Sequence, residues 1–284
     1  MKVVEGWKTS SLPLLLHLMK SGGTPNTSRS DYYGGKIPFV SIEDMTASNK
    51  HLTSTIKKLT DKGLKNSNAW IVPKNSILYS IYATLGLPRI NTIPVATNQA
   101  ILALINDLNK IDRDYLYYWF EYIRASVVNF SSQTTQSNLS ATIVKTFLVD
   151  HPTDLSEQVK IAEILSTADR TIEQTEAIIA KQQRIKTGLM QDMLTRGIDE
   201  HGSIRSEETH EFKDSPPALL DLPMTAPKYP KEQRRILKVM GTFRLGQTQS
   251  LERLRKLYSL KTALMQDLPT GKMCVTPLLE DGTP

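Results

Sequence analysis

The sequence predicts an α+β (mixed α/β) N-terminal domain followed by two long antiparallel coiled-coil-like α-helices. Three observations support this prediction: strand-like apolar runs occur in the first half of the chain, a stretch of about 40 residues occurs twice near the C-terminus, and a proline-rich segment separates its two copies. We assign the domain to residues 1–153, the helices to 154–196 and 231–270, the linker to 197–230 and a tail to 271–284.

Three apolar runs in the N-terminal domain predict β-strands, and an aromatic-rich segment predicts a helix. The runs are Ile37–Ile42, Ser76–Tyr82 and Ala100–Ile105, and they contain the β-branched and aromatic residues that favour strands. The segment Asp112–Ile123 has an acidic first turn, which is favourable at a helix N-terminus. Strands and helices mixed in about 150 residues suit one domain with its own core.

The repeat predicts two copies of one long helix. Lys186–Asp192 returns as Lys261–Asp267, an offset of 261 − 186 = 75 positions. Apolar residues in both copies recur at alternating steps of about three and four, a narrow seam typical of coiled coils. Because so thin a stripe leaves an isolated helix marginal, each copy needs a partner, and the other copy is the simplest one. The predicted interface residues are Ile161, Leu165, Ile172, Ile179, Leu189, Met193, Ile236, Met240, Leu254, Leu264 and Leu268.

Prolines exclude regular structure from most of the segment between the helices. Gly197 and Gly202 are typical of helix ends, and the prolines that follow are Pro216, Pro217, Pro223, Pro227 and Pro230. This linker is acidic, with three basic and seven acidic residues (3 − 7 = −4). It is long enough for the helices to fold back antiparallel, within one chain or across a dimer.

Composition limits the classes of function. No apolar run is long enough to cross a bilayer, so we expect no membrane partner and a cytoplasmic location. With one cysteine (Cys274) and scattered histidines, we expect neither a disulfide nor a metal site. Residues 1–150 carry 16 basic and 10 acidic residues, which suits a polyanion partner but also an ordinary solvated surface.

Motifs for catalysis are missing from the sequence. It contains neither a phosphate-binding loop of the Gly-x-x-x-x-Gly-Lys-Ser/Thr type nor a glycine-rich methyl-donor motif after a strand. We therefore expect a non-catalytic chain that binds no cofactor itself, with any chemistry supplied by partners.

Seven short motifs follow one another along the chain. They are Glu5-Gly6-Trp7, Ser21-Gly22-Gly23-Thr24-Pro25, Tyr33–Pro38, Ala96–Ala100, Thr134–Ser140, Glu157-Gln158 and Gly188–Gly197. In this order the motifs resemble the specificity (S) subunits of type I restriction–modification systems. The resemblance covers nearly the whole chain, and it includes the repeated helix. Members of that family usually carry two target recognition domains, each followed by a long helix. One domain is missing between the two helices here, so the chain resembles a half-length S subunit.

The resemblance implies partners and a division of labour. It implies a target recognition domain at residues 1–153 that reads double-stranded DNA, and helices that dock methyltransferase (M) subunits and, through them, restriction (R) subunits. S-adenosylmethionine, ATP and Mg are then expected on the partner subunits, and a homodimer would restore two reading domains. An alternative from another class stays open: a coiled-coil assembly protein that does not bind DNA, such as the product of a silent specificity cassette.

Compact amide and hydroxyl clusters are the candidate DNA contacts. Amides can pair with adenine edges, arginine with guanine, and backbone amides with phosphates. The alternative interpretation is that the glycines and the Asn98-Gln99 pair simply form turns. The DNA-binding candidates are Gly22, Thr24, Lys36, Arg89, Asn98, Gln99, Thr134, Thr135, Gln136 and Asn138, with Arg89 favoured among the cations.

Overall fold

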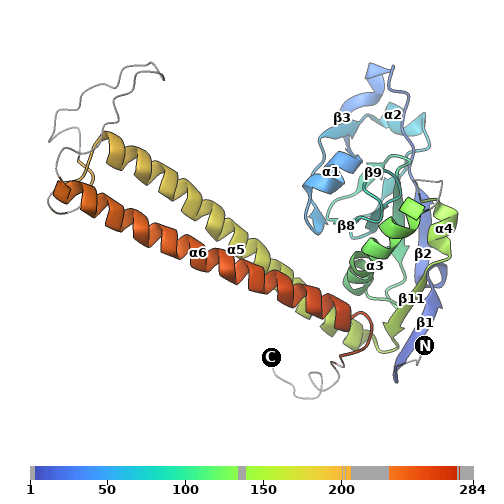
Figure 1. Cartoon of the computed structure of the whole chain (residues 1–284). Helices are drawn as coiled ribbons and strands as arrows, with labels where there is room; N and C mark the ends of the chain where they lie inside the picture. The colour runs from blue at the N-terminus through green and yellow to red at the C-terminus, as the bar shows by residue number, and fades with distance from the viewer. Residues whose placement is uncertain are drawn as a thin grey trace. The chain divides into compact units, whose positions relative to one another are not determined.

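The computed structural model describes residues 4–133, 139–199, 201, 203–205, 230–273 and 275. The chain divides into two compact units (Figure 1). The N-terminal unit comprises Met1–Ser166 and Thr262–Pro284, and the helical unit comprises Thr167–Lys261. The N-terminal unit therefore extends past the predicted boundary at residue 153 and also includes the end of the second long helix.

Short strands with a few helices among them precede the two long helices in the described part of the chain. The strands are β1 (Trp7–Ser11), β2 (Leu16–Ser21), β3 (Tyr33–Val40), β4 (His51–Leu52), β5 (Lys57–Leu59), β6 (Ile71–Val72), β7 (Ile77–Ser80), β8 (Pro88–Asn91), β9 (Val95–Thr97), β10 (Ile101–Asn106) and β11 (Leu148–Pro152). The helices are α1 (Ile42–Ala47), α2 (Asp61–Lys65), α3 (Arg113–Gln133), α4 (Ala141–Lys145), α5 (Leu155–Thr195) and α6 (Pro230–Asp267), with short 3₁₀ helices η1 (Leu12–Leu15) and η2 (Ser30–Tyr32). This order confirms the predicted fold class.

A five-stranded sheet forms the centre of the N-terminal unit, with strand order β2-β10-β7-β8-β4. Successive residues of β7 and β10 enter two different clusters: Tyr79 and Leu104 pack with α3, whereas Leu78 and Ala103 pack with residues of β3, β6 and β9. Because both faces of this sheet are covered, its central strands are continuous apolar runs without alternation. This explains why the sequence predicted β7 and β10 correctly.

A second, four-stranded sheet has the order β5-β3-β9-β6. Strand β3 pairs with β9 in parallel and with β5 in antiparallel orientation. The predicted strand Ile37–Ile42 overlaps β3 but extends too far, because Ser41 caps α1. The Ser41 hydroxyl accepts from the Asp44 N–H, and the Asp44 carboxylate accepts from the Ser41 N–H, a capping box that turns the chain into a helix.

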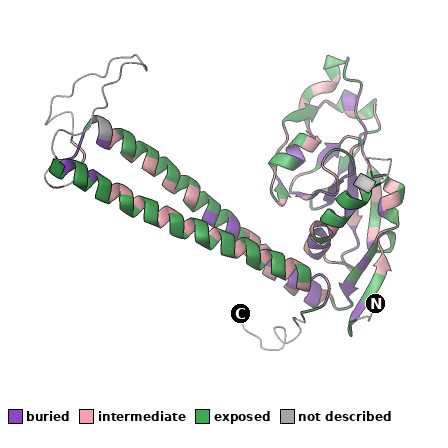
Figure 2. Ribbon diagram, in the orientation of Figure 1, coloured by how far each residue is buried: buried purple, intermediate pink, exposed green. Residues whose placement is uncertain are grey.

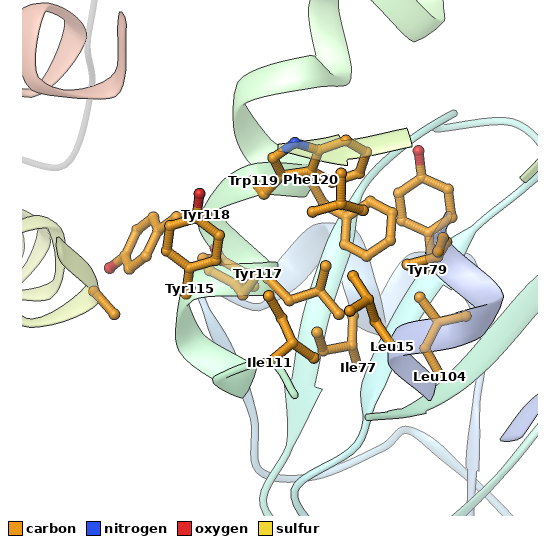
Figure 3. Close-up of a cluster of buried hydrophobic side chains, with 14 of the residues drawn as sticks. Leu15, Ile77, Tyr79, Leu104, Ile111, Tyr115, Tyr117, Tyr118, Trp119 and Phe120 are labelled. Carbon is orange, nitrogen blue, oxygen red and sulfur yellow. The ribbon is translucent and has the colours of Figure 1, made fainter. Parts of the chain in front are cut away.

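Helix α3 supplies most of the aromatic core of the N-terminal unit. Tyr115, Tyr118 and Phe120 are almost fully buried, and the Phe120 ring lies 4.5 Å from that of Tyr79 between ring centroids (Figure 3). The helix predicted at Asp112–Ile123 is therefore confirmed, although it continues to Gln133. The buried side chains of α3 cover one face of the central sheet.

The two ends of the N-terminal domain meet in a separate antiparallel pair, in which Trp7 lies opposite Pro152. Buried polar groups join this pair to the start of α5. His151 donates from Nδ1 to the Pro152 carbonyl (2.8 Å) and accepts at Nε2 from Ser10, and Gln158 donates to the same carbonyl. Burial lowers the pKa of His151, so the ring stays neutral near pH 7.

Helices α5 and α6 agree with the two predicted helices to within a few residues at each end. In the helical unit the two helices run antiparallel, because a later residue of α5 contacts an earlier residue of α6. Asp169 pairs with Lys261 at 2.5 Å, whereas Gln183 accepts from Gln247 at 2.8 Å. Much of the surface of both helices is exposed (Figure 2). Within the described part of the chain, no helix is both long and apolar enough to cross a membrane.

The predicted interface residues lie on the sides of α5 and α6 that are packed against other side chains. In the N-terminal unit Ile161, Leu165 and Leu268 are fully buried and Leu264 is half-buried. In the helical unit Ile172, Met193 and Ile236 are buried, and the half-buried positions are Ile179, Leu189, Met240 and Leu254.

The end of α5 is held against the start of α6. Gly197 adopts a positive φ of 72°, which favours glycine after a helix. The next residue, Ile198, donates its N–H to the Glu232 carboxylate at 2.8 Å, and Arg205 lies 3.3 Å from the same carboxylate. The buried Glu232 therefore anchors the start of the linker inside the helical unit.

Candidate nucleic-acid interface

A pocket of about 520 Å³ opens beside the four-stranded sheet of the N-terminal unit. Its walls come from four separate parts of the sequence: the loop after β2, strand β3 with Ser41, strand β5 with Ile56, and the turn between β9 and β10. The lining residues are Thr24, Thr27, Tyr33, Gly34, Phe39, Ser41, Ile56, Lys57, Lys58 and Asn98.

Two of the predicted DNA-binding residues, Thr24 and Asn98, line this pocket, and a third, Gln99, is bonded to Thr24. The Thr24 hydroxyl donates to Gln99 Oε1 at 2.5 Å, and Asn98 accepts at Oδ1 from the Ala100 N–H at 3.0 Å. Thr24 and Gln99 are exposed and Asn98 is half-buried. The alternative interpretation of Asn98 is partly correct, since its oxygen does form the turn, but its amide nitrogen has no partner among the described residues.

Gly22 has a packing role in the structure. It is buried, and its N–H donates to the Ile101 carbonyl at 3.4 Å. A Cβ atom at this position would lie 1.9 Å from the carbonyl oxygen of Thr97, so only glycine fits. The expectation that this amide contacts a phosphate is therefore corrected, because the amide is already used inside the protein.

Lys57 and Lys58, which the sequence analysis missed, lie on β5 at the pocket, and the predicted Lys36 lies on the adjacent strand β3. All three side chains are exposed. In the described ranges no acidic side chain pairs with Lys57 or Lys58, so both ammonium groups are available to an anion. A pair of lysines before a single apolar residue is too common to single out by sequence.

The backbone that presents these lysines is held by a buried carboxylate. Asp44 Oδ1 accepts from the Ile56 N–H at 2.8 Å, while its other oxygen completes the cap of α1. Thr55 donates its hydroxyl to the Lys57 carbonyl at 2.7 Å. The segment therefore has a defined conformation before any ligand binds, which lowers the entropy cost of binding.

Arg89, the favoured cationic candidate, is held inside the N-terminal unit. Its Nε donates to the carbonyls of Met45 and Ser48, both at 2.9 Å, and Nη1 lies 3.5 Å from Glu121. Its side chain is 11% exposed, and burial lowers its pKa. Through these contacts Arg89 has a structural role, since it joins α1 to α3. Most of its guanidinium is already bonded within the protein and is not available to a DNA base.

The remaining candidates, Thr134, Thr135, Gln136 and Asn138, lie outside the described residues. Among the residues that are described, no group of histidine, cysteine, aspartate or glutamate side chains could hold a metal ion. The pocket is therefore a surface of hydroxyls, amides, lysines and apolar walls. These groups can bind by charge, hydrogen bonding and shape.

Comparisons with known proteins agree on one family. Residues 4–183 match the model of the type I restriction modification DNA specificity domain. The chain is 30% identical over 159 residues to the type I restriction enzyme MjaIX specificity subunit of Methanocaldococcus jannaschii, covering 54% of this chain and 35% of that protein. It is 25% identical over 185 residues to the EcoprrI specificity subunit of Escherichia coli, covering 63% and 45% of the two chains.

A solved structure shows the same fold. The S subunit of a type I restriction-modification system from M. genitalium superposes with a TM-score of 0.58 at 12% identity, covering 94% of this chain and 97% of that one. The chain spans less than half the length of the two curated relatives. Because the family model matches more than half of the chain, the protein belongs to the type I restriction modification DNA specificity domain family.

Proposed function

We propose that this chain is the DNA-reading subunit of a type I restriction–modification complex, in which the N-terminal unit binds one half of a divided target site. One observation carries the proposal: hydroxyls, an amide, and lysines that have no acidic partner among the described residues lie around one pocket of the N-terminal unit, although they come from separate segments. Lysines at phosphates position such a protein, while amides and hydroxyls can read base edges.

The two long helices are proposed to dock the M subunits, and through them the R subunits. Large apolar side chains on the helical unit support a docking role, because they stay exposed when α5 and α6 are packed together: Ile178 (50%), Leu237 (69%) and Leu245 (61%). In this proposal these side chains supply the apolar contacts of a docked M subunit. S-adenosylmethionine, ATP and Mg belong to these partners in this proposal.

The DNA-binding half of the proposal is tested by removing the pocket lysines. In the variant Lys57→Ala/Lys58→Ala, DNA binding should weaken by at least about fivefold, and the slope of log Kd against log salt should fall by about 2, because two phosphate contacts are lost. Gel shifts and anisotropy at several salt concentrations, with and without the M subunit, measure both quantities.

A matched control removes the same charge elsewhere on the N-terminal unit. Lys8 and Lys145 are exposed and lie outside the pocket. The variant Lys8→Ala/Lys145→Ala should keep the wild-type salt slope. Equal losses in the two double variants would mean that net charge alone drives binding, and no shift under any condition would favour the non-DNA-binding assembly protein.

Chemistry is expected only from partner subunits. The purified chain should neither methylate nor cleave DNA, since the sequence has no nucleotide or methyl-donor motif. Transfer of label from S-adenosylmethionine to DNA should appear only after the M subunit is added. Label transfer by the pure chain would refute this expectation.

Assembly should restore a second reading domain. Two chains related by a twofold axis would present two identical N-terminal units, and such a dimer reads a palindromic site. Bound to M subunits, the chain should therefore be present in two copies and direct methylation of an interrupted palindrome. Light scattering measures the copy number, and methylation mapping measures the site; one undivided, asymmetric target would rule the dimer out.

A further inference from the structure

Ile56 is an exposed apolar side chain on a fixed backbone. Its side chain is 68% exposed although its N–H is bound by the buried Asp44 carboxylate. Single exposed isoleucines are ordinary on protein surfaces. This one is unusual in its surroundings, because it lines the pocket and is followed directly by Lys57 and Lys58.

The pocket suits a flat, mostly apolar group that is attached to an anion. Phe39, Tyr33 and Ile56 contribute apolar walls, and the volume of about 520 Å³ falls in the range that holds small organic ligands. It is far larger than one phosphate needs. Thr27 adds a hydroxyl, and Asn98 adds an amide nitrogen that has no partner within the described ranges.

DNA contains a group of this description when one base leaves the helical stack. Proteins that unstack DNA commonly insert an apolar side chain, isoleucine included, between base steps. The displaced base then needs a pocket, and its phosphates need cations beside it. In the structure Ile56, Lys57 and Lys58 form one short segment, and all three residues line the pocket.

We propose that the pocket binds an unstacked nucleotide of the bound DNA, with Ile56 filling the space that its base leaves and Lys57 and Lys58 holding its flanking phosphates. The proposal rests on the DNA-binding function proposed above. It adds an apolar contact that deforms the DNA, so part of the target would be read through the ease with which one base leaves the stack.

The experiment compares three duplexes that share one arbitrary sequence: a fully paired duplex, a duplex with one unpaired nucleotide, and a duplex in which that unpaired nucleotide has no base. The full-length chain, alone and with its M subunit, should bind the duplex with the unpaired base at least about fivefold more tightly than the other two, since the cost of unstacking has been removed in advance. The duplex without the base has the same bend but nothing to fill the pocket.

The variant Ile56→Ser should lose this preference, so that its affinities for the three duplexes become similar. Leu108→Ser is the matched control, because Leu108 is 66% exposed and lies outside the pocket; it should keep the preference. Melting curves of both variants verify that the N-terminal unit is folded.

Three results would overturn the proposal. Equal affinities for the paired and the unpaired duplex would do so, as would equally tight binding of the duplex without the base, which would indicate a preference for bent DNA. An unchanged preference in Ile56→Ser would remove Ile56 from the mechanism. Failure to bind any of the three duplexes would instead refute the proposed function, and this inference with it.

Discussion

Leu165→Asp is expected to lower the free energy of unfolding by more than about 3 kcal/mol, because it places an unpaired carboxylate in an apolar cluster. Leu165 is fully buried in the core of the N-terminal unit, together with Ile161 and Leu268. Thermal denaturation followed by circular dichroism measures the change, and a loss of this size corresponds to at least about 6 °C in melting temperature.

Two other substitutions on α5 calibrate this result. Ile179 is only half-buried, so Ile179→Asp should cost less than Leu165→Asp, although both positions belong to the same predicted seam. Gln174 is exposed on the same helix, and Gln174→Asp should change stability by no more than about 0.5 kcal/mol. If all three variants melted at the wild-type temperature, the periodic stripe would not be a packing interface.

Gly22→Ala is expected to destabilise the N-terminal unit by about 3 kcal/mol, since its new methyl group would overlap the backbone of Thr97. Neither the loop after β2 nor β9 can move freely to relieve this overlap, because the Gly23 N–H is bonded to the Thr97 carbonyl at 3.0 Å. Urea denaturation followed by circular dichroism gives the free energy of unfolding.

A second glycine provides a control of opposite sign. Gly188 lies inside α5 with nothing within 4 Å of an added Cβ. Gly188→Ala should therefore stabilise the helix by about 1 kcal/mol, because alanine has the higher helix propensity. A Gly22→Ala variant of normal stability with impaired DNA binding would reverse our assignment, and would restore the original expectation that Gly22 meets the DNA.

The sequence alone determined the elements that periodicity can reveal. The two long helices could be predicted because their apolar seam recurs over many turns, and the repeat shows the same pattern twice. Strands β7 and β10 could be predicted because a strand covered on both faces is an uninterrupted apolar run. Strands such as β4, β5 and β6 could not, since a pair or triplet of residues has no period and pairs only with segments far away in the chain.

Only the tertiary structure decided which candidate side chains are available to a ligand. Arg89 and Lys57 are both cations on short strands, yet Arg89 donates to carbonyls that lie 41 and 44 positions earlier, whereas no described acidic group pairs with Lys57. By sequence both Gly22 and Asn98 could be turn residues, but the close approach of Thr97 shows that Gly22 is packed inside the protein. The local sequence gives the type of each residue and the spacing of apolar residues. The burial of a side chain and its bonding partners depend on contacts between distant segments, which form only when the chain has folded.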